Sequence, residues 1–313
     1  MGRIHGMDLT RRKLIGLVGA GVAFGRASTA AIVRAAAQSG LPREAGASSS
    51  DLPHPPGGRL GLELYSLRNE LKEDLAGALK TVRQWGFEEV ELAGLPPLTP
   101  AETARALRAA GLRAVSAFID YERLRDDLGA VVRDAHTLGL EYLICGWIPH
   151  EQSLTRGEVD RAIADFDAWG AAAARERLRF AYHVHGYEFV ASPDGTMLDT
   201  LLERTSPEHV DYEMDVFWVV RGGGDPVALL GRYGDRFPLL HLKDMERGTA
   251  TGVTTGQAPD EASVPLGTGA IDVPAVLQAA AKARVKWYFI DDEHPDAVAQ
   301  IPRSLAYLRR LKL

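Results

Sequence analysis

From Arg59 to the end of the chain, short apolar runs alternate with longer segments whose apolar residues recur every three or four positions. The short runs are typical of buried strands, and the longer segments are typical of amphipathic helices. The pattern predicts strands over 61–67, 88–92, 112–119, 141–147, 179–185, 210–216, 238–242 and 286–290.

The predicted helices cover 74–85, 100–110, 124–138, 156–175, 196–205, 226–233, 273–283 and 298–311, and several of them stop at a glycine, as helix C-caps do. Strands that alternate with helices pair in parallel through right-handed crossovers. A (β/α)8 barrel needs about 250 residues. We therefore predict an α/β fold, a single-domain (β/α)8 TIM barrel over residues 59–313. A doubly wound sheet is the alternative, but the first strand-to-helix turn, at 66–69, lacks a glycine-rich phosphate loop.

The first 58 residues differ in charge from the rest. They carry seven Lys or Arg against three Asp or Glu, a net charge of +4, whereas the other 255 residues carry −10. Arg11 and Arg12 precede an apolar run over 14–24, which is shorter than the roughly 20 residues of a membrane span. This pattern predicts a twin-arginine-type export signal over 1–37, read by the twin-arginine machinery, and a flexible linker over 38–58. The protein is then periplasmic or otherwise exported; the alternative is an amphipathic N-terminal helix on a cytosolic protein.

Composition excludes several classes of protein. Cys145 is the only cysteine in the sequence, so no disulfide scaffold can form within one chain. The acidic balance argues against nucleic-acid binding, which requires a basic surface. The same balance disfavours phosphodiester hydrolysis on DNA, although repair endonucleases share this type of barrel.

Polar residues gather where the predicted strands end, and that end of a TIM barrel carries the active site. Alone, each of these residues could be structural. Together, their recurrence on strands five to eight predicts a site in which carboxylates and imidazoles bind Mn, Mg, Co, Zn or Fe. The residues are Glu63, Tyr65, Arg68, Glu91, His183, His185, Glu188, Glu213, Asp215, Trp218, His241, Lys243, Asp291 and Glu293.

The segment YHVHGYEF at 182–189 resembles the YHNHxxEF signature of the sugar phosphate isomerase/epimerase family, whose members have a xylose isomerase-like barrel. Further similar segments are GLELYSLR (61–68), VELAG (90–94), DVFWV (215–219), HLKDM (241–245) and PLGTG (265–269). The resemblance covers essentially all of residues 59–313. Export signals of the twin-arginine type are frequent in one branch of the family.

The resemblance implies one metal ligand from each of strands five to eight: His183, Asp215, His241 and Asp291. Two positions depart from the family pattern. His183 stands where many metal-dependent members have Glu, and Asp291-Asp292-Glu293 stands where this branch often has Glu-Gln-Asp. Glu293 is therefore an alternative ligand to Asp291.

The activity implied is isomerisation or epimerisation of a ketose or keto-sugar, by metal-assisted removal of an α-proton through an enediolate. Glu188, Asp291 and Glu293 are the candidate catalytic carboxylates, on opposite faces of the sugar. The resemblance also implies that a group of polar and aromatic residues binds the substrate: Tyr65, Arg68, Glu91, His185, Trp218 and Lys243. Elimination by a lyase or dehydratase, and a sugar-binding barrel without catalysis, are the alternatives. The loop 245–264 is expected to be a lid, or else an insertion that contacts a partner.

Overall fold

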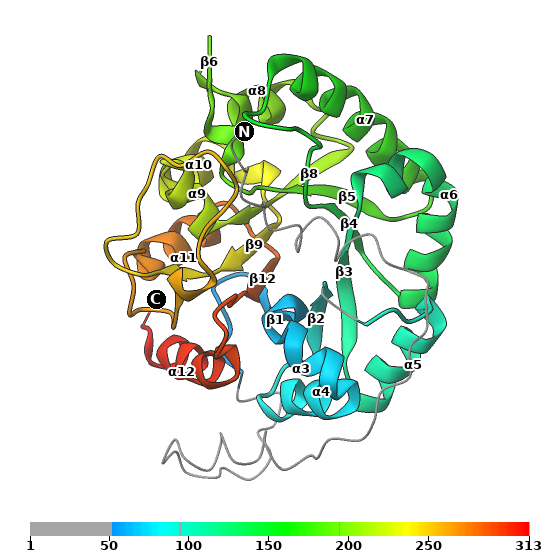
Figure 1. The fold of residues 1–313 in the computed structure, drawn as a ribbon, viewed down its shortest axis with the longest axis vertical. Coiled ribbons are helices and arrows are strands. Elements are labelled where there is room, and N and C mark those ends of the chain that lie inside the picture. Colours follow the sequence, from blue (N-terminus) through cyan, green and yellow to red (C-terminus); the bar gives the residue numbers. More distant parts are fainter. Residues whose placement is uncertain (1–51, 94–95, 194, 313) are drawn as a thin grey trace, which may run out of the picture.

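The computed structural model describes residues 52–93, 96–193 and 195–312. Within them, eight parallel strands form a closed barrel, in which β1 pairs with both β2 and β12 (Figure 1). The strands are β1 (Arg59–Glu63), β2 (Glu89–Leu92), β3 (Arg113–Ile119), β4 (Tyr142–Cys145), β5 (Arg179–His183), β8 (Val210–Asp215), β9 (Leu239–Leu242) and β12 (Trp287–Ile290). The (β/α)8 barrel predicted from the sequence is confirmed.

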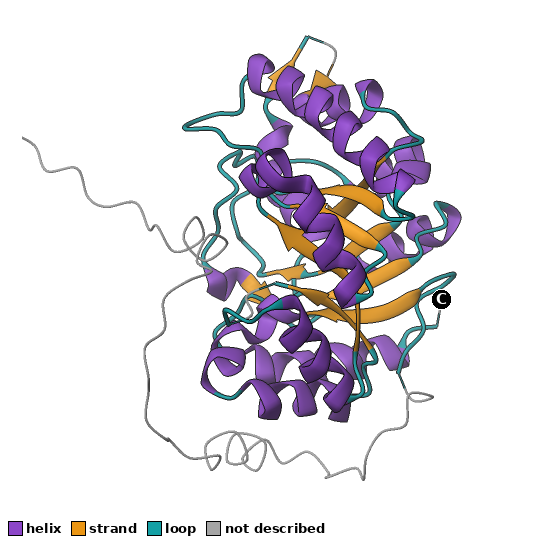
Figure 2. Cartoon of the chain, turned by 90° about the vertical axis from the view of Figure 1, so that its right-hand side faces the viewer, coloured by secondary structure: helices purple, strands orange, loops and turns teal. Residues whose placement is uncertain are grey.

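Helices surround the barrel on its outside (Figure 2). They are α4 (Leu75–Gln84), α5 (Pro100–Ala110), α6 (Tyr121–Leu138), α7 (Arg156–Arg175), α8 (Met197–Arg204), α10 (Pro226–Tyr233), α11 (Val273–Lys282) and α12 (Ala297–Arg310). Thr99, Thr155 and Thr196 begin three of them with capping boxes, in which the side chain accepts a bond from the backbone three residues on. Among the described residues, no helix has both the length and the apolarity that crossing a bilayer requires.

Short elements join the ends of the strands to the helices. The helices α3 (Arg68–Glu73) and α9 (Val216–Gly222) were not predicted from the sequence. Two small antiparallel pairs lie outside the barrel: β6 (Ala191–Ser192) with β7 (Gly195–Thr196), and β10 (Asp244–Met245) with β11 (Ser263–Val264).

Three of the predicted strands end at least two residues earlier than expected. β1 stops at Glu63 and continues as a 3-10 turn over Leu64–Leu67, β4 stops at Cys145, and β5 stops at His183. β9 ends at Leu242, as predicted. After β5 the chain turns at Gly186, whose φ of 82° and close approach to the Trp218 carbonyl exclude a side chain. Tyr65 and His185, which fall within predicted strands, therefore lie in a 3-10 turn and in a loop, and Lys243 lies in the loop directly after β9.

The barrel interior is filled in layers. At the amino-terminal end of the strands, the guanidinium groups of Arg59 and Arg113 each lie 5.4 Å from the centre of the Trp287 ring, and both pair with Glu89. An apolar layer follows, formed by Val115, Tyr142, Ile144, Ala181, Leu239 and Phe289. Polar side chains begin only above this layer, toward the carboxyl ends of the strands.

The predicted export signal and most of the predicted linker lie outside the described residues. Residues 52–58, at the end of that linker, pack on the barrel: Leu52 is buried, and the Tyr288 hydroxyl donates a hydrogen bond to the Pro56 carbonyl at 3.2 Å.

Candidate active site

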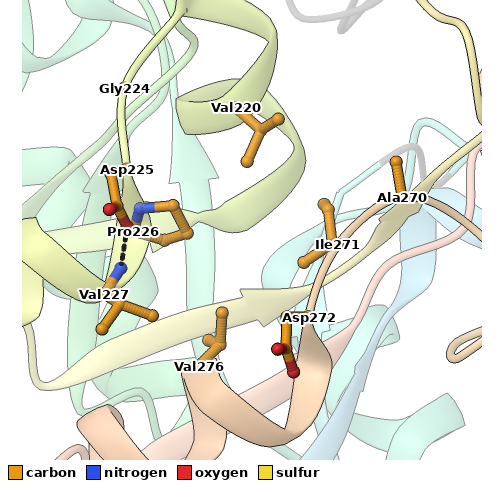
Figure 3. Close-up of a pocket in the computed structure, with 9 residues that line it drawn as sticks. All are labelled: Val220, Gly224, Asp225, Pro226, Val227, Ala270, Ile271, Asp272 and Val276. Carbon is orange, nitrogen blue, oxygen red and sulfur yellow. Dashed lines mark hydrogen bonds between the residues drawn. The ribbon is translucent and has the colours of Figure 1, made fainter.

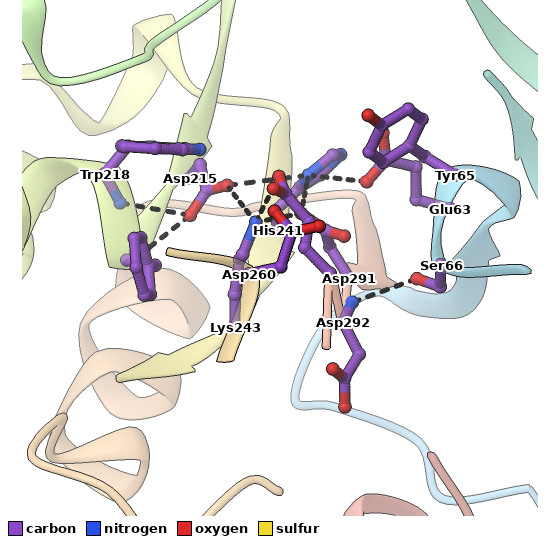
Figure 4. Close-up of polar contacts among 12 residues, drawn as sticks. Glu63, Tyr65, Ser66, Asp215, Trp218, His241, Lys243, Asp260, Asp291 and Asp292 are labelled. Carbon is purple, nitrogen blue, oxygen red and sulfur yellow. Dashed lines mark hydrogen bonds and ion pairs between the residues drawn. The ribbon is translucent and has the colours of Figure 1, made fainter. Parts of the chain in front are cut away.

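Four acidic and imidazole side chains converge above the apolar layer (Figure 4). His241 Nδ1 lies 3.7 Å from Glu63 Oε2, 3.7 Å from Asp291 Oδ2 and 3.9 Å from Asp215 Oδ2. His183 joins them from β5, with its Nε2 atom 3.9 Å from the same oxygen of Asp215. All are buried. The structure thus brings together the four residues that the family resemblance implied as metal ligands.

The unpartnered atoms of this group show what it can hold. Among the described residues, Asp215 Oδ2, His241 Nδ1 and Asp291 Oδ1 are buried without a hydrogen-bond partner. Burying such atoms unsatisfied costs free energy, which a bound cation would offset. Glu63, His241 and Asp291 also place their ligand atoms within 4.8 Å of one another, as do His183, Glu213 and His241. Nitrogen and carboxylate donors at these spacings fit a divalent metal.

Lys243 supplies a positive charge next to this group. Its Nζ atom is 2.8 Å from Asp291 Oδ2, 2.6 Å from Glu293 Oε1 and 3.9 Å from Asp215 Oδ2. The ammonium also lies 5.5 Å from the Trp218 ring centre. Because the side chain is 1% exposed, these contacts replace water around the charge.

The pKa values of the neighbouring carboxylates are shifted in different directions. Burial and the neighbouring Asp291 raise the pKa of Glu63 well above its usual range, and burial raises the pKa of Asp215 to about 6. Burial acts on Asp291 in the same direction, but the Lys243 ammonium and the His241 imidazole together outweigh it and hold the pKa of Asp291 well below its usual range. The surroundings therefore favour the charged form of Asp291 and the neutral form of Glu63.

The two histidines have opposite pKa shifts. Burial lowers the pKa of His183 well below its ordinary value, and the nearby His185 imidazole adds to this effect. Burial also acts to lower the pKa of His241, but the carboxylates around it, Glu213 foremost, raise it well above the ordinary value. The carboxylates therefore favour a positive charge at His241, and a cation bound at its Nδ1 atom would take the place of that proton.

Glu91, expected to bind substrate, lies underneath His241 instead. The Glu91 carboxylate is fully buried, with Oε1 2.6 Å from His241 Nε2 and Oε2 accepting a bond from the Ser116 hydroxyl at 2.5 Å. Glu213 has a similar position beside His183 and is also fully buried; burial and the Glu91 charge raise its pKa to about 8. The sequence analysis listed Glu213 among the polar residues at the strand ends but assigned it no function.

Glu188, expected to be a catalytic base, faces away from this group. Its carboxylate accepts hydrogen bonds from the Tyr182 hydroxyl and, at 3.0 Å, from the His185 backbone N–H. The Tyr182 ring stacks on Phe166 of α7, so Glu188 lies on the helix side of β5. Burial raises the pKa of Glu188 to about 7.

An aromatic wall follows the ends of β4, β5 and β8. The His185 ring lies 5.6 Å from Trp218 and 5.8 Å from Trp147, and Trp147 stacks on His150 at 4.7 Å. Trp147 and His150 were missed in the sequence analysis. Their position directly after the fourth strand was the signal that could have identified them.

The loop 246–262 crosses the mouth of the barrel. A Cβ on Gly256 would lie 2.9 Å from the rings of Trp147 and Tyr187, so this glycine sits directly on the wall. Arg68 binds Asp260 at 2.7 Å and the Glu293 carbonyl at 2.8 Å, and its guanidinium lies 4.7 Å from the Tyr65 ring centre. Arg68 thus connects the loop to the backbone of Glu293, while Tyr65 lies beside Glu63 (Figure 4).

A separate hollow of about 240 Å³ lies between α9, α10 and α11 (Figure 3). Its two carboxylates, Asp225 and Asp272, accept backbone bonds at the starts of α10 and α11. The remainder of its lining is mostly apolar, so the hollow lacks the chemistry found at the barrel mouth.

Comparison with known proteins agrees with this geometry. An inosose dehydratase from Geobacillus kaustophilus is 26% identical over 250 residues, which cover 71% of this chain and 80% of that protein. The crystal structure of a sugar phosphate isomerase/epimerase from Parabacteroides distasonis superposes with a TM-score of 0.67 at 25% identity, covering 81% of this chain and 99% of that one.

A xylose isomerase-like TIM barrel protein from Mycobacterium smegmatis, solved in complex with magnesium, has the same fold, with a TM-score of 0.62 at 14% identity over 84% of this chain and 97% of that one. The family model described as xylose isomerase-like TIM barrel matches residues 79–311. With the closed barrel and the buried acidic group at its mouth, this match shows that the chain belongs to the xylose isomerase-like TIM barrel family.

Proposed function

We propose that this protein is a dehydratase of polyhydroxylated ketones. In this reaction the proton on the carbon next to the carbonyl is removed, and the hydroxyl on the following carbon leaves as water. One observation carries the proposal: the groups that can exchange protons, Asp291, Glu293 and Lys243, form a single ion-paired group on one side of Asp215 and His241. Epimerisation requires a second base on the opposite face, where Glu188 is turned toward the helices.

Asp215, His241, Asp291 and His183 would hold a divalent cation, which supplies Lewis-acid polarisation of the substrate carbonyl when it is bound. The cation's fit to these residues is supported by the unpartnered atoms of Asp215, His241 and Asp291.

The proton steps use Glu293 and Lys243. Glu293, the more exposed of the two carboxylates that Lys243 binds, takes the α-proton, and the electron pair of the broken C–H bond forms the enediolate. The Lys243 ammonium donates a proton to the departing β-hydroxyl, so that the C–O bond breaks and water leaves. Lys243 regains its proton from Glu293, 2.6 Å away. The enol product becomes a 1,2-dione, and the net change is the loss of one water.

The walls of the site suit a sugar-like ring. Trp218, Trp147 and His185 would offer flat faces to C–H groups, and the loop 246–262 would help to keep bulk water from the site. The curated relatives named as inosose dehydratases favour a cyclic polyhydroxy ketone as the substrate.

Aldose–ketose isomerisation is the second candidate. A base on one side of the substrate can return the proton to the neighbouring carbon. The sugar phosphate isomerase/epimerase from Parabacteroides distasonis, which aligns with this chain over 99% of its own length at 25% identity, supports this candidate.

The test is to incubate the Mn²⁺-loaded protein in deuterated buffer with 2-keto-myo-inositol, ketopentoses and ketohexoses. We expect formation of a dione and loss of water from the inosose, with kcat reduced at least ~100-fold by Glu293→Gln and by Lys243→Met. Glu89→Gln, at the other end of the barrel, is the matched control. Interconversion of aldose and ketose without loss of water would favour the second candidate. If no substrate lost water and none exchanged its α-proton with solvent, both candidates would be refuted.

A further inference from the structure

We infer that Glu91 and Glu213 are positioning residues that fix the two imidazoles of the site in the tautomers that turn their other nitrogens toward Asp215. The inference rests on the proposed metal-assisted function. It concerns residues beneath the site, and it assigns Glu213, which could itself reach a metal ion beside His183 and His241, to their support and not to the ligand set.

The contacts of His241 define its orientation. Its Nε2 atom lies 2.6 Å from Glu91 Oε1 and 3.3 Å from Glu213 Oε2, so the Nε2 proton points down into the barrel. The opposite tautomer would place the lone pair of Nε2 against two carboxylates. The Nδ1 atom is thereby left facing Asp215 Oδ2 at 3.9 Å, without a hydrogen-bond partner among the described residues.

His183 is held in the mirrored arrangement. Its Nδ1 atom lies 2.8 Å from Glu213 Oε2, which leaves Nε2 to face Asp215 Oδ2 at 3.9 Å. The same oxygen of Glu213 therefore binds both rings, whose centres are 4.7 Å apart. A single carboxylate thus sets the orientation of the two imidazoles relative to each other.

The remaining neighbours prevent this arrangement from relaxing. Ser116 holds the second oxygen of Glu91 at 2.5 Å, and the Phe118 ring packs edge-on against His183 at 5.1 Å and His241 at 6.3 Å. Glu91, Ser116 and Glu213 have no exposed surface, so water cannot replace a lost partner. Outer-shell carboxylates of this kind orient ligating histidines and raise their basicity, and their loss costs about 10- to 100-fold in metal affinity.

The test measures binding of Mn²⁺ and Zn²⁺, and the visible spectrum of the Co²⁺-loaded protein, for Glu91→Met and Glu213→Met. We expect affinities about 10- to 100-fold below the wild type and an altered Co²⁺ spectrum. Glu91→Gln retains an acceptor oxygen and should restore part of the affinity. Glu89→Met, two residues earlier on β2, is the matched control and should bind metal as the wild type does.

Nitrogen-15 spectra of the histidines in the Zn²⁺-loaded protein give a readout independent of activity. We expect a proton on Nε2 of His241 and on Nδ1 of His183, and loss of these signals in the Met variants. Folded Met variants with unchanged affinity and spectra would overturn the inference alone. If the Met variants do not fold, Ser116→Ala provides the test, because it keeps both carboxylates. Weaker metal binding by this variant supports the inference, and unchanged metal binding and spectra refute it. A wild type that binds none of the three ions would refute the metal proposal and this inference with it.

Discussion

At the scale of single residues, the two oxygens of Asp215 have different partners. Oδ1 accepts the backbone N–H groups of Phe217 at 2.8 Å and Trp218 at 3.3 Å, and so caps α9, whereas Oδ2 faces the two histidines. Because the helix start fixes one oxygen, the other has little freedom to turn. A side chain in the site is thus oriented by the backbone that follows it.

Glu188 gives the clearest pH dependence of any single residue here. Its pKa is raised from 4.5 to about 7, so between these values the folded chain binds more protons than the unfolded chain. The stabilising contribution is fully present below pH 4.5 and is lost as pH rises toward 7. We expect Glu188→Gln to remove this dependence, so that the variant gains up to about 3 kcal/mol relative to the wild type between pH 4.5 and 7.5.

Urea unfolding of both proteins at several pH values measures this difference. Glu208→Gln, an exposed acidic position, should show no comparable change relative to the wild type. A constant difference between wild type and Glu188→Gln across the range would contradict the prediction.

The sequence predicted the residue types of the site better than their orientations. Asp215, His241 and Asp291 could be found because strand alternation decides which side chains point into a barrel. Glu188 could not be placed in this way, since its direction depends on the turn at Gly186 and on Tyr182, a partner on the outer face of β5. Asp260 reaches Arg68 from a loop 192 residues later, which no local pattern predicts.

At the scale of elements, the loop 265–271 is held by one buried side chain. Asp244 accepts backbone N–H groups from Met245, Gly267, Gly269 and Ile271 at 2.8 to 3.1 Å. These bonds connect β10 to the start of α11, beside the site. The loop therefore depends on the acidic residue that follows Lys243.

We expect Asp244→Asn to destabilise the protein by about 2–5 kcal/mol. The amide nitrogen of asparagine cannot accept the N–H groups that one oxygen now holds, and each buried unsatisfied donor costs roughly 1–3 kcal/mol. Equilibrium urea unfolding measures the loss. The control is Asp225→Asn, which retains a good N-cap for α10 and should change little. Equal stability of the two variants would count against this account of the loop.

The loop 246–262 offers a second test at this scale. Gly256 and Gly252 both have positive φ, 64° and 73°, but only Gly256 lies against the rings of Trp147 and Tyr187. We expect Gly256→Ala to lift the loop and Gly252→Ala to leave it in place. Hydrogen exchange of the Val253 amide, bonded to the Arg221 carbonyl at 3.0 Å, should accelerate in the first variant only. The same rate in both variants would argue against contact with the wall.

Most elements were predictable from the spacing of apolar residues, and α5, α7 and α10 have the predicted bounds. Some bounds differ at the start of an element, such as α6, which begins three residues earlier than predicted, but the missed elements lie at the carboxyl ends of strands. Leu64–Leu67 and Val216–Gly222 are apolar enough to resemble continuations of the strands before them. In the structure both segments are short helices at the mouth of the barrel. Sequence patterning records burial, and burial alone does not distinguish a strand from a short helix.

At the scale of the whole molecule, the barrel buries more acid than base at one end. Glu63, Glu91, Glu213, Asp215, Asp291 and Glu293 lie around Lys243 and His241. We expect Mn²⁺ to raise the melting temperature of the wild type, with about 2.7 kcal/mol of stabilisation at a free concentration 100 times Kd. EDTA should reverse the effect.

Asp215→Asn and Asp211→Asn form a matched pair for this measurement, because both lie on β8 and differ in the end of the barrel they occupy. The first should lose most of the Mn²⁺-dependent shift, whereas the second, which removes a pairing with Arg179, should keep it. A shift of the same size in both variants would place the bound ion elsewhere.

Arg59, Trp287 and Arg113 stack on one another, and with the apolar layer above them they close the amino-terminal end of the barrel. In the proposed reaction, substrate and products would therefore pass through the opposite end of the barrel, which the loop 246–262 crosses. Entry and departure are then successive uses of the same passage. In the proposed reaction, movement of this loop would therefore limit turnover independently of the chemical step.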